Sequence, residues 1–411
     1  MRPCATLLGA LLLTAMAHGQ DARVKTGIEV LRDNSFEMLQ DKTVGLITNP
    51  TGVDAQLHST IDILHQAEGV TLRCLFGPEH GARGEYAAGE AVGSTRDART
   101  GLPVYSLYGS HRAPSPEELE GLDLLVYDIQ DNGCRSYTYI STMGLAMAAA
   151  AEAGVGFMVL DRPNPLGGLR IEGSCVEPGF ESFVGQFAIP YVYGLTPGEL
   201  ARMLNDEGML PGGLRCELTV VPMEGWERRM TFEETGLPWV PPSPHLPESR
   251  TVPYYVATGV MGELQTINHG VGYTIPFQTF AASWIDGVSF AEHASALNLP
   301  GVLFRPITYR AYYGPWEDQT LHGVQIYVID PAAVNLLSIQ FRLLELHHEL
   351  YPEHDVFEEA GSSRSRMFDK VMGSDRVREL FRQRYRYEDV RALLERDEKA
   401  FRERSARYLL Y

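Results

Sequence analysis

The sequence is poor in positive charge, and beyond its first residues it has no long apolar run. Lys and Arg number 35 against 53 Asp and Glu, which gives a formal net charge of −18. A surface this acidic argues against nucleic acid or an anionic membrane as the main partner. A bilayer-spanning helix needs about 20 apolar residues, so we expect no membrane span.

Cysteine is also scarce, with five residues that form neither a CxxC pair nor a metal-ligand pattern. Four of them lie beyond the N-terminal segment, at Cys74, Cys134, Cys175 and Cys216. In an oxidising compartment, Cys175–Cys216 is the best candidate for a disulfide, and small buried thiols are an equal alternative. A chain of this length does not depend on disulfides to fold.

The first 19 residues have the pattern of a cleavable export signal. Arg2 precedes an apolar stretch at 7–13, and the small residues at 15–17 provide a cleavage site. We therefore expect a signal peptide over 1–19 and a periplasmic or secreted protein of 392 residues (411 minus 19).

Short apolar strands alternate with helical patterns through the first half of the chain. Strands are predicted at 44–48, 71–76, 104–107, 122–127 and 157–160. Because they are apolar almost throughout, they indicate a parallel sheet covered by helices on both faces. Cap motifs with a following proline predict further helix starts after Ser115 and Thr196.

A proline-rich segment at 238–253 separates this half from a second, mixed one, because it suits neither a helix nor a central strand. After it we expect a strand at 323–329 and helices at 333–351 and from 375 onward. The sequence thus predicts an α/β domain over 20–237 and a smaller α+β domain over 238–411.

Polar loops follow four of the predicted strands, at residues 49–52, 77–84, 128–135 and 161–168. In an open parallel sheet, ligands bind outside the carboxyl ends of the strands, so we expect these loops to share one polar site. The loops lack GxGxxG and GxxxxGK[ST], which leaves a nucleotide cofactor unsupported, and we expect no cofactor. HxH, HxxxH and HExxH spacings are missing too, although a metal-dependent hydrolase around His80, Asp131 and Asp161 stays open as an alternative.

Carboxylate chemistry is what these loops support best. Glu79 follows a proline and precedes His80, on a stiff turn able to hold its carboxyl in one direction. A carboxyl partly withdrawn from water keeps its proton to higher pH and can donate it to a leaving oxygen. Asp128, Asp131 and Asp161 are candidates for a second carboxylate. For Asp128, capping of the following helix is an equal alternative.

Other side chains in the loops are candidates for substrate contacts. Arg135 and Arg162 would clamp an anionic group, and Tyr137 and Tyr139 would stack on a sugar face. For Arg162, an internal ion pair with Asp161 is the structural alternative.

Seven motifs in this order also resemble one family. They are FGPEHG at 76–81, LPVYSLYG at 102–109, DIQD at 128–131, RSYTY at 135–139, DRPNP at 161–165, GLTPGEL at 194–200 and PPSP at 241–244. With them the chain resembles, from residue 27 to its end, the bacterial exo-β-N-acetylmuramidases typified by NamZ.

The resemblance implies a Rossmann-like first domain, a smaller second domain and an active cleft between them. It also implies removal of N-acetylmuramic acid from the non-reducing end of peptidoglycan fragments, with Glu79 as the central acid. Asn49, His80, Asp161 and Asn164 join the expected substrate-binding residues. The second carboxylate stays open, because an acetamido sugar can act as its own nucleophile.

The second half departs from the family pattern at 268–274. Many members read SEGRGT where this chain has NHGVGYT, so that His269 and Val271 replace an acid and an arginine. His269 is therefore a candidate substrate contact, and the sugar specificity stays open. A catalytically silent cell-wall-binding protein is the second hypothesis.

Overall fold

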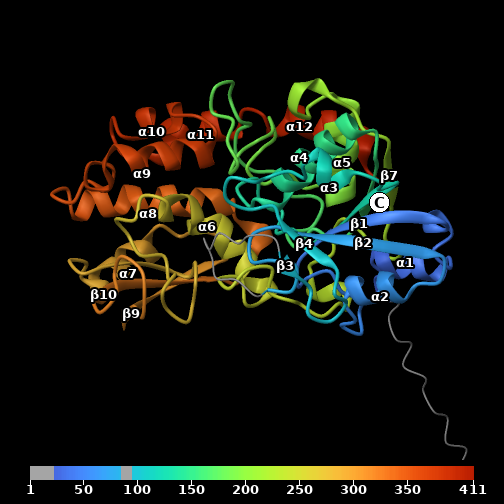
Figure 1. Ribbon diagram of the computed structural model, residues 1–411. Helices are drawn as coiled ribbons and strands as arrows, with labels where there is room; N and C mark the ends of the chain where they lie inside the picture. Colours follow the sequence, from blue (N-terminus) through green and yellow to red (C-terminus); the bar gives the residue numbers. More distant parts are fainter. Residues whose placement is uncertain (1–22, 85–94) are drawn as a thin grey trace, which may run out of the picture.

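Two sheets organise the protein, which we describe from a computed structural model over residues 23–84 and 95–411 (Figure 1). The expected signal peptide at 1–19 lies outside the described residues. The described residues fold into a larger and a smaller domain. The α/β class predicted from the strand–helix alternation is confirmed. None of the helices within the described ranges is long and apolar enough to cross a membrane.

The larger domain holds a seven-stranded sheet in the order β3-β4-β2-β1-β5-β6-β7. All neighbouring strands are parallel except β3 and β4. The strands are β1 (Lys42–Thr48), β2 (Val70–Gly77), β3 (Thr95–Arg96), β4 (Pro103–Ser106), β5 (Leu124–Asp128), β6 (Gly156–Leu160) and β7 (Leu218–Val221).

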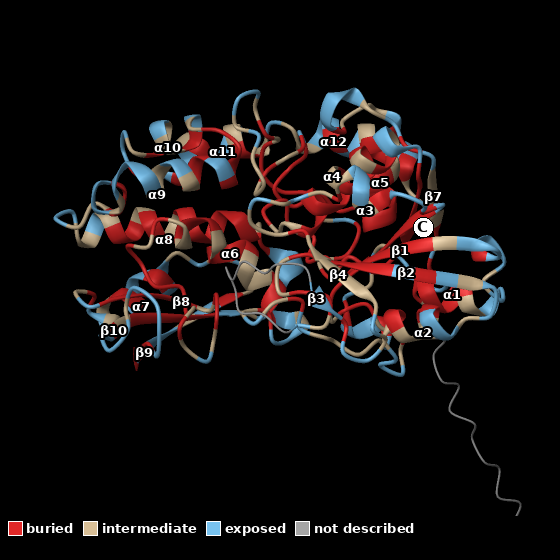
Figure 2. Ribbon diagram, viewed as in Figure 1, coloured by how far each residue is buried: buried red, intermediate tan, exposed pale blue. Residues whose placement is uncertain are grey.

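Helices cover both faces of this sheet, as its apolar strands require. Side chains alternate between two cores, with Leu46 and Val126 in one and Ile47 and Tyr127 in the other. The central strands are accordingly buried (Figure 2). One core is closed by α1 (Gly27–Asp33) and α2 (Thr60–Gln66), and the other by α3 (Pro116–Leu119), α4 (Tyr139–Ala153) and α5 (Pro197–Asp206).

The order of the strands reverses at the centre of the sheet. From β1, the chain adds β2 on one side and later adds β5 and β6 on the other. Such a switch point leaves a crevice at the carboxyl ends of the strands, where open α/β sheets bind their ligands. The four polar loops that follow β2, β1, β5 and β6 therefore lie next to one another, as the sequence predicts.

The smaller domain is built on an antiparallel sheet in the order β8-β10-β9, in which only β10 was predicted. Its strands are β8 (Thr279–Ala282), β9 (Val302–Arg310) and β10 (Thr320–Val328), and its helices are α6 (Val252–Gly262), α7 (Gly287–Ala296), α8 (Leu336–Leu350), α9 (Val356–Met372), α10 (Arg376–Phe381) and α11 (Tyr387–Glu395). Helices α6 and α8 pack together in its core.

The last part of the chain returns to the larger domain. Phe401 of α12 (Glu398–Ser405) and Tyr408 lie in the core that α4 and α5 close. The hydroxyl of the terminal Tyr411 donates to Asp161 Oδ2 at 2.7 Å. The end of the predicted 238–411 domain is thus packed against the first one.

The four cysteines beyond the N-terminal segment are free thiols. Cys216 lies against Asn205, with Sγ 3.5 Å from Oδ1, and it forms no disulfide with Cys175. The alternative of free thiols is therefore the one that this structure supports, with Cys175 partly exposed and the other three buried.

Candidate active site

A tight turn after β2 presents Glu79 at the carboxyl edge of the sheet. Gly81 N donates to Pro78 O at 2.9 Å, and His80 has φ 75°, which makes Glu79 the second residue of a type II turn. Glycine usually occupies the position of His80, because a side chain there costs about 1 kcal/mol. Gly77 is needed as well, since a Cβ there would lie 2.7 Å from Ala82 N. The turn fixes the direction of the Glu79 side chain.

Glu79 is half-buried among side chains that come from different parts of the chain. The Tyr108 hydroxyl lies against its carboxylate, and burial together with this contact raises the pKa of Tyr108 to about 12. Tyr139 lies within electrostatic reach of Glu79. So does His245, whose pKa is lowered by burial and then by the neighbouring His80. We call these five residues the Glu79 site: Glu79, His80, Tyr108, Tyr139 and His245.

The proline-rich segment closes one side of this site. The Tyr139 hydroxyl donates to Pro242 O at 2.5 Å, and His245 lies three residues farther along. Asn49, at the end of β1, lies beside Tyr139 and accepts from Thr51 N at 2.9 Å. The Asn49 Nδ2 atom is buried without a partner. The segment predicted as a domain boundary thus contributes to the site itself.

Asp131 lies within electrostatic reach of Tyr137 and Tyr139 and is 2% exposed. Its Oδ2 accepts from Gly133 N at 2.7 Å and from the Tyr193 hydroxyl, while Oδ1 has no partner. Burial raises the pKa of Asp131 to about 6. An unpaired buried carboxyl oxygen is uncommon in folded proteins, and it favours the protonated form.

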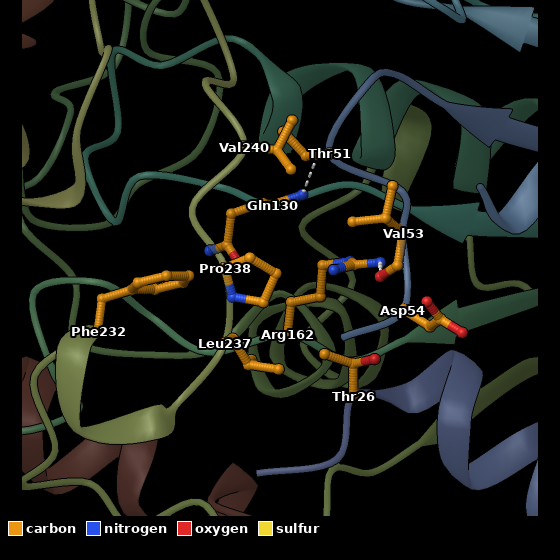
Figure 3. Close-up of a pocket in the computed structure, with 10 residues that line it drawn as sticks. All are labelled: Thr26, Thr51, Val53, Asp54, Gln130, Arg162, Phe232, Leu237, Pro238 and Val240. Atoms are coloured by element: carbon orange, nitrogen blue, oxygen red, sulfur yellow. Dashed lines mark hydrogen bonds between the residues drawn. The ribbon is translucent and has the colours of Figure 1, made fainter. Parts of the chain in front are cut away.

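Asp128 and Arg162 form a buried ion pair rather than a substrate contact. Arg162 Nε donates to Asp128 Oδ1 at 2.5 Å and Nη2 donates to Oδ2 at 2.9 Å, while Thr60 donates to the same Oδ2 at 2.5 Å. Figure 3 shows Arg162 reaching past a pocket toward Val53, whose carbonyl accepts from Nη2 at 2.8 Å. The pocket has a volume of about 20 Å³, which suits a water molecule and excludes a sugar.

Asp161 holds the beginning of α5 in place. Its Oδ1 accepts from the backbone of Arg162 and Gly198, and its Oδ2 accepts from Thr196 and Tyr411. The structural alternative for Arg162, an internal ion pair, is therefore right in kind and wrong in its partner, because the guanidinium pairs with Asp128 and not with Asp161. The alternative of a helix cap by Asp128 is also wrong, because the following helix, α4, begins at Tyr139 with Thr138 at its N-cap.

Two further candidate substrate contacts, Arg135 and Asn164, make their hydrogen bonds inside the protein instead. Arg135 is fully buried and donates from Nη1 and Nη2 to four carbonyl oxygens, those of Ser174, Ile189, Val371 and Met372. Two of these lie in each domain, so Arg135 joins the larger domain to the C-terminal end of α9. Asn164 Nδ2 donates to Leu195 O at 2.9 Å, and its Oδ1 closes a turn at Leu166. This geometry does not support contacts of either side chain with substrate.

A row of aromatic rings runs from the site into the second domain. The ring centroids lie 4.9 Å apart for Tyr139 and Tyr137, 5.9 Å for Tyr137 and Tyr255, 5.0 Å for Tyr255 and Phe277, and 5.1 Å for Phe277 and His269. Burial lowers the pKa of His269 to about 3, and its Nδ1 has no partner. His269 is therefore neutral at neutral pH and offers no positive charge to a substrate carboxylate.

The sequence interpretation missed Tyr108 and His245 as members of the site. Tyr108 was within reach of the same argument, because it follows β4, the neighbour of β2 in the sheet. His245 carried no such signal, since it lies in an irregular segment that pairs with no strand. Among residues 23–84 and 95–411 no group of three or more His, Cys, Asp or Glu side chains has metal-ligand geometry, and Asp161 has both oxygens occupied.

Fold and site together define a two-domain α/β protein with a half-buried glutamate at the switch point of a parallel sheet. The chain belongs to the NamZ family. The sequence model of the family described as exo-beta-N-acetylmuramidase NamZ, N-terminal, matches residues 44–250. The one described as exo-beta-N-acetylmuramidase NamZ, C-terminal, matches residues 253–411.

Relatives resemble the chain over nearly its whole length. It is 42% identical over 389 residues to the peptidoglycan beta-N-acetylmuramidase NamZ of Bacillus subtilis (strain 168), which covers 95% of this chain and 92% of the relative. A DUF1343 family protein from Bacteroides fragilis has a similar crystal structure, with a TM-score of 0.91 and 53% identity over 95% of this chain and 99% of the other. A second one has a TM-score of 0.75 and 27% identity over 94% and 99%.

Proposed function

We propose that this protein is an exo-acting glycoside hydrolase that removes N-acetylmuramic acid from the non-reducing end of peptidoglycan fragments. Its membership of the NamZ family and its 42% identity to a peptidoglycan beta-N-acetylmuramidase support the substrate class. The observation that carries the chemistry is the position of Glu79, half-buried on a rigid turn and in contact with Tyr108.

Glu79 is the proton donor in this proposal. A glycosidic bond breaks when the leaving oxygen receives a proton while positive charge develops at the anomeric carbon. The turn holds the carboxyl at the end of β2, where the Tyr108 hydroxyl contacts it and His245 lies within electrostatic reach. After cleavage, the same carboxylate accepts a proton from the incoming water.

We assign the second role, attack on the anomeric carbon, to the acetamido oxygen of the substrate. Within the part of the chain that the structure describes, the other candidate carboxylates are occupied or enclosed. Asp128 and Asp161 have both oxygens bonded, and Asp131 is 2% exposed. A sugar that supplies its own nucleophile needs one enzyme carboxylate. Asp131 then has a structural role, as the acceptor of hydrogen bonds from Tyr193 and from the backbone of Gly133.

We further propose that the protein acts outside the cytoplasm. The N-terminal pattern of Arg2, an apolar stretch and small residues at 15–17 supports export with cleavage near residue 19. The mass of the protein purified from its own host tests this. A mature chain that begins near Gln20 is expected, and an intact N-terminus would contradict it.

The function is tested with a chromogenic N-acetyl-β-muramide and the matching N-acetyl-β-glucosaminide, which lacks the lactyl group. We expect turnover of the muramide and release of free N-acetylmuramic acid from wall fragments. Binding of wall fragments without turnover of either substrate would instead select a silent binding protein. Activity that disappears on chelation and returns with a metal ion would select the metal-dependent alternative.

A further inference from the structure

Two exposed tyrosines form a ledge beside the Glu79 site. Tyr312 is 62% exposed and Tyr313 is 48% exposed, and both belong to the loop that joins β9 to β10. Adjacent exposed aromatic side chains beside a polar site form a surface of the kind that contacts ligands. We call this pair the tyrosine shelf.

The shelf is connected to the site through one side chain. The Tyr313 hydroxyl lies 2.6 Å from His245 Nε2, and the two rings stack with centroids 6.1 Å apart. His245 in turn lies within electrostatic reach of Glu79. A molecule held at Glu79 and extending outward on this side would therefore reach the tyrosines.

The shelf is also held rigidly. Tyr312 N donates to Gly272 O at 2.7 Å, and the Tyr312 ring lies 5.5 Å from Tyr273, which stacks on Tyr309 at 4.6 Å. Gly272 admits this close approach, because a Cβ there would lie 2.5 Å from Tyr313 O. Rings that are ordered before binding lose little entropy when a ligand packs on them.

We propose that the tyrosine shelf binds the leaving-group side of the glycan, meaning the sugars that follow the cleaved terminal residue. This inference rests on the proposed function, because an exo-acting enzyme holds one sugar at its acid and must place the remaining chain on an open surface. A pyranose offers an apolar face of C–H groups for an aromatic ring and hydroxyls for a phenol. The Tyr312 and Tyr313 side chains carry no charge, which suits a glycan freed of its acidic peptides.

The test compares substrates of two lengths. One is the chromogenic N-acetyl-β-muramide, which has a single sugar, and the other is a peptide-free tetrasaccharide with N-acetylmuramic acid at its non-reducing end. For Tyr312→Ala, we expect kcat/KM to fall about tenfold more on the tetrasaccharide than on the chromogenic substrate, mainly through KM. Equal losses on the two substrates, or no loss on either, would overturn the proposal.

Two further variants sharpen the result. Tyr327→Ala removes a tyrosine that is 37% exposed on β10, roughly 20 Å from the loop, and should leave the ratio between the substrates at its wild-type value. Tyr313→Phe removes the hydroxyl and keeps the ring, so a ratio near that of wild type is expected. A fall as large as that of Tyr312→Ala would assign the effect to the bond with His245.

Binding measured without turnover separates this inference from the proposed function. In the Glu79→Gln background, calorimetry with the tetrasaccharide should show about tenfold weaker binding once Tyr312→Ala is added. If the wild type cleaves neither substrate, the proposed function fails, and this calorimetric difference still decides the shelf. Loss of a concentration-dependent dimer in Tyr312→Ala, with unchanged glycan binding, would assign the shelf to a second copy of the chain.

Discussion

The carboxyl ends of β6 and β2 carry similar residues and use them in opposite ways. After β6, Asp161 has four hydrogen bonds to its two oxygens, and Arg162 is paired with a buried aspartate. After β2, Glu79 is half-buried and contacts the hydroxyl of Tyr108. A charged residue at a strand end therefore has a structural role when all its hydrogen bonds are made inside the protein. It can act on a substrate when some of its bonding capacity is left over.

Substitution in the Asp128–Arg162 pair is expected to have the largest effect on stability, and it tests whether the residues at the β6 end are structural. Asp128→Asn leaves a buried guanidinium without its counter-charge, so we expect a loss of roughly 3–5 kcal/mol in the free energy of unfolding. Activity per folded molecule should stay close to that of wild type. Adding Arg162→Met should recover much of the stability, because no buried charge then remains. A stable but inactive Asp128→Asn protein would move Asp128 into the active site.

The pH dependence of stability probes Asp131, whose pKa is raised by burial from an ordinary 3.8 to about 6. The folded protein then holds this proton more tightly than the unfolded chain. Its stabilising contribution is complete below about pH 4 and is lost as the pH rises to about 6. By linkage this amounts to about 3 kcal/mol. Denaturation from pH 4 to 8 should show a flatter profile for Asp131→Asn, and parallel profiles would contradict the burial argument.

The C-terminal Tyr411 gives a smaller test of the β6 end. Its hydroxyl donates to Asp161 at 2.7 Å and accepts from Met223 N at 2.7 Å. Tyr411→Phe removes both bonds and should lower the free energy of unfolding by about 1–3 kcal/mol. Turnover of the chromogenic muramide should persist. Unchanged stability would show that the returning C-terminus does not hold α5.

Tyr108→Phe has the smallest expected effect and tests the β2 end of the sheet. It removes the hydroxyl beside Glu79, which is worth about 1 kcal/mol, so kcat should fall about fivefold. The melting temperature should stay within a few degrees of wild type, because the ring is retained. A loss of stability without a loss of kcat would place Tyr108 with the structural residues.

The sequence predicts the fold well because its strands are strongly marked. The apolar runs at 44–48 and 157–160 became β1 and β6, and the capping boxes at Ser115 and Thr196 both formed. Strands β8 and β9 were missed: β8 has only four residues, two of them alanine, and β9 contains Pro306, which argues against a strand.

For the site, the sequence correctly predicted that the four loops lie together. It did not predict which of their side chains use all their hydrogen bonds inside the protein. Arg135 shows the limit, since its four carbonyl partners come from positions up to 237 residues away. Asp161 likewise depends on Tyr411, at the far end of the chain. Hydrogen-bond saturation is a property of the folded structure, and local motifs do not encode it.

The central claim, that Glu79 protonates the leaving oxygen, is tested most directly by varying the leaving group in the Glu79→Gln protein. A sugar or 4-methylumbelliferone needs the proton far more than 2,4-dinitrophenol, which leaves readily as an anion. We predict that Glu79→Gln loses about 10²–10⁴-fold in kcat on the poor leaving groups and much less on the dinitrophenyl muramide. Equal losses across the series would contradict the claim and assign Glu79 another role.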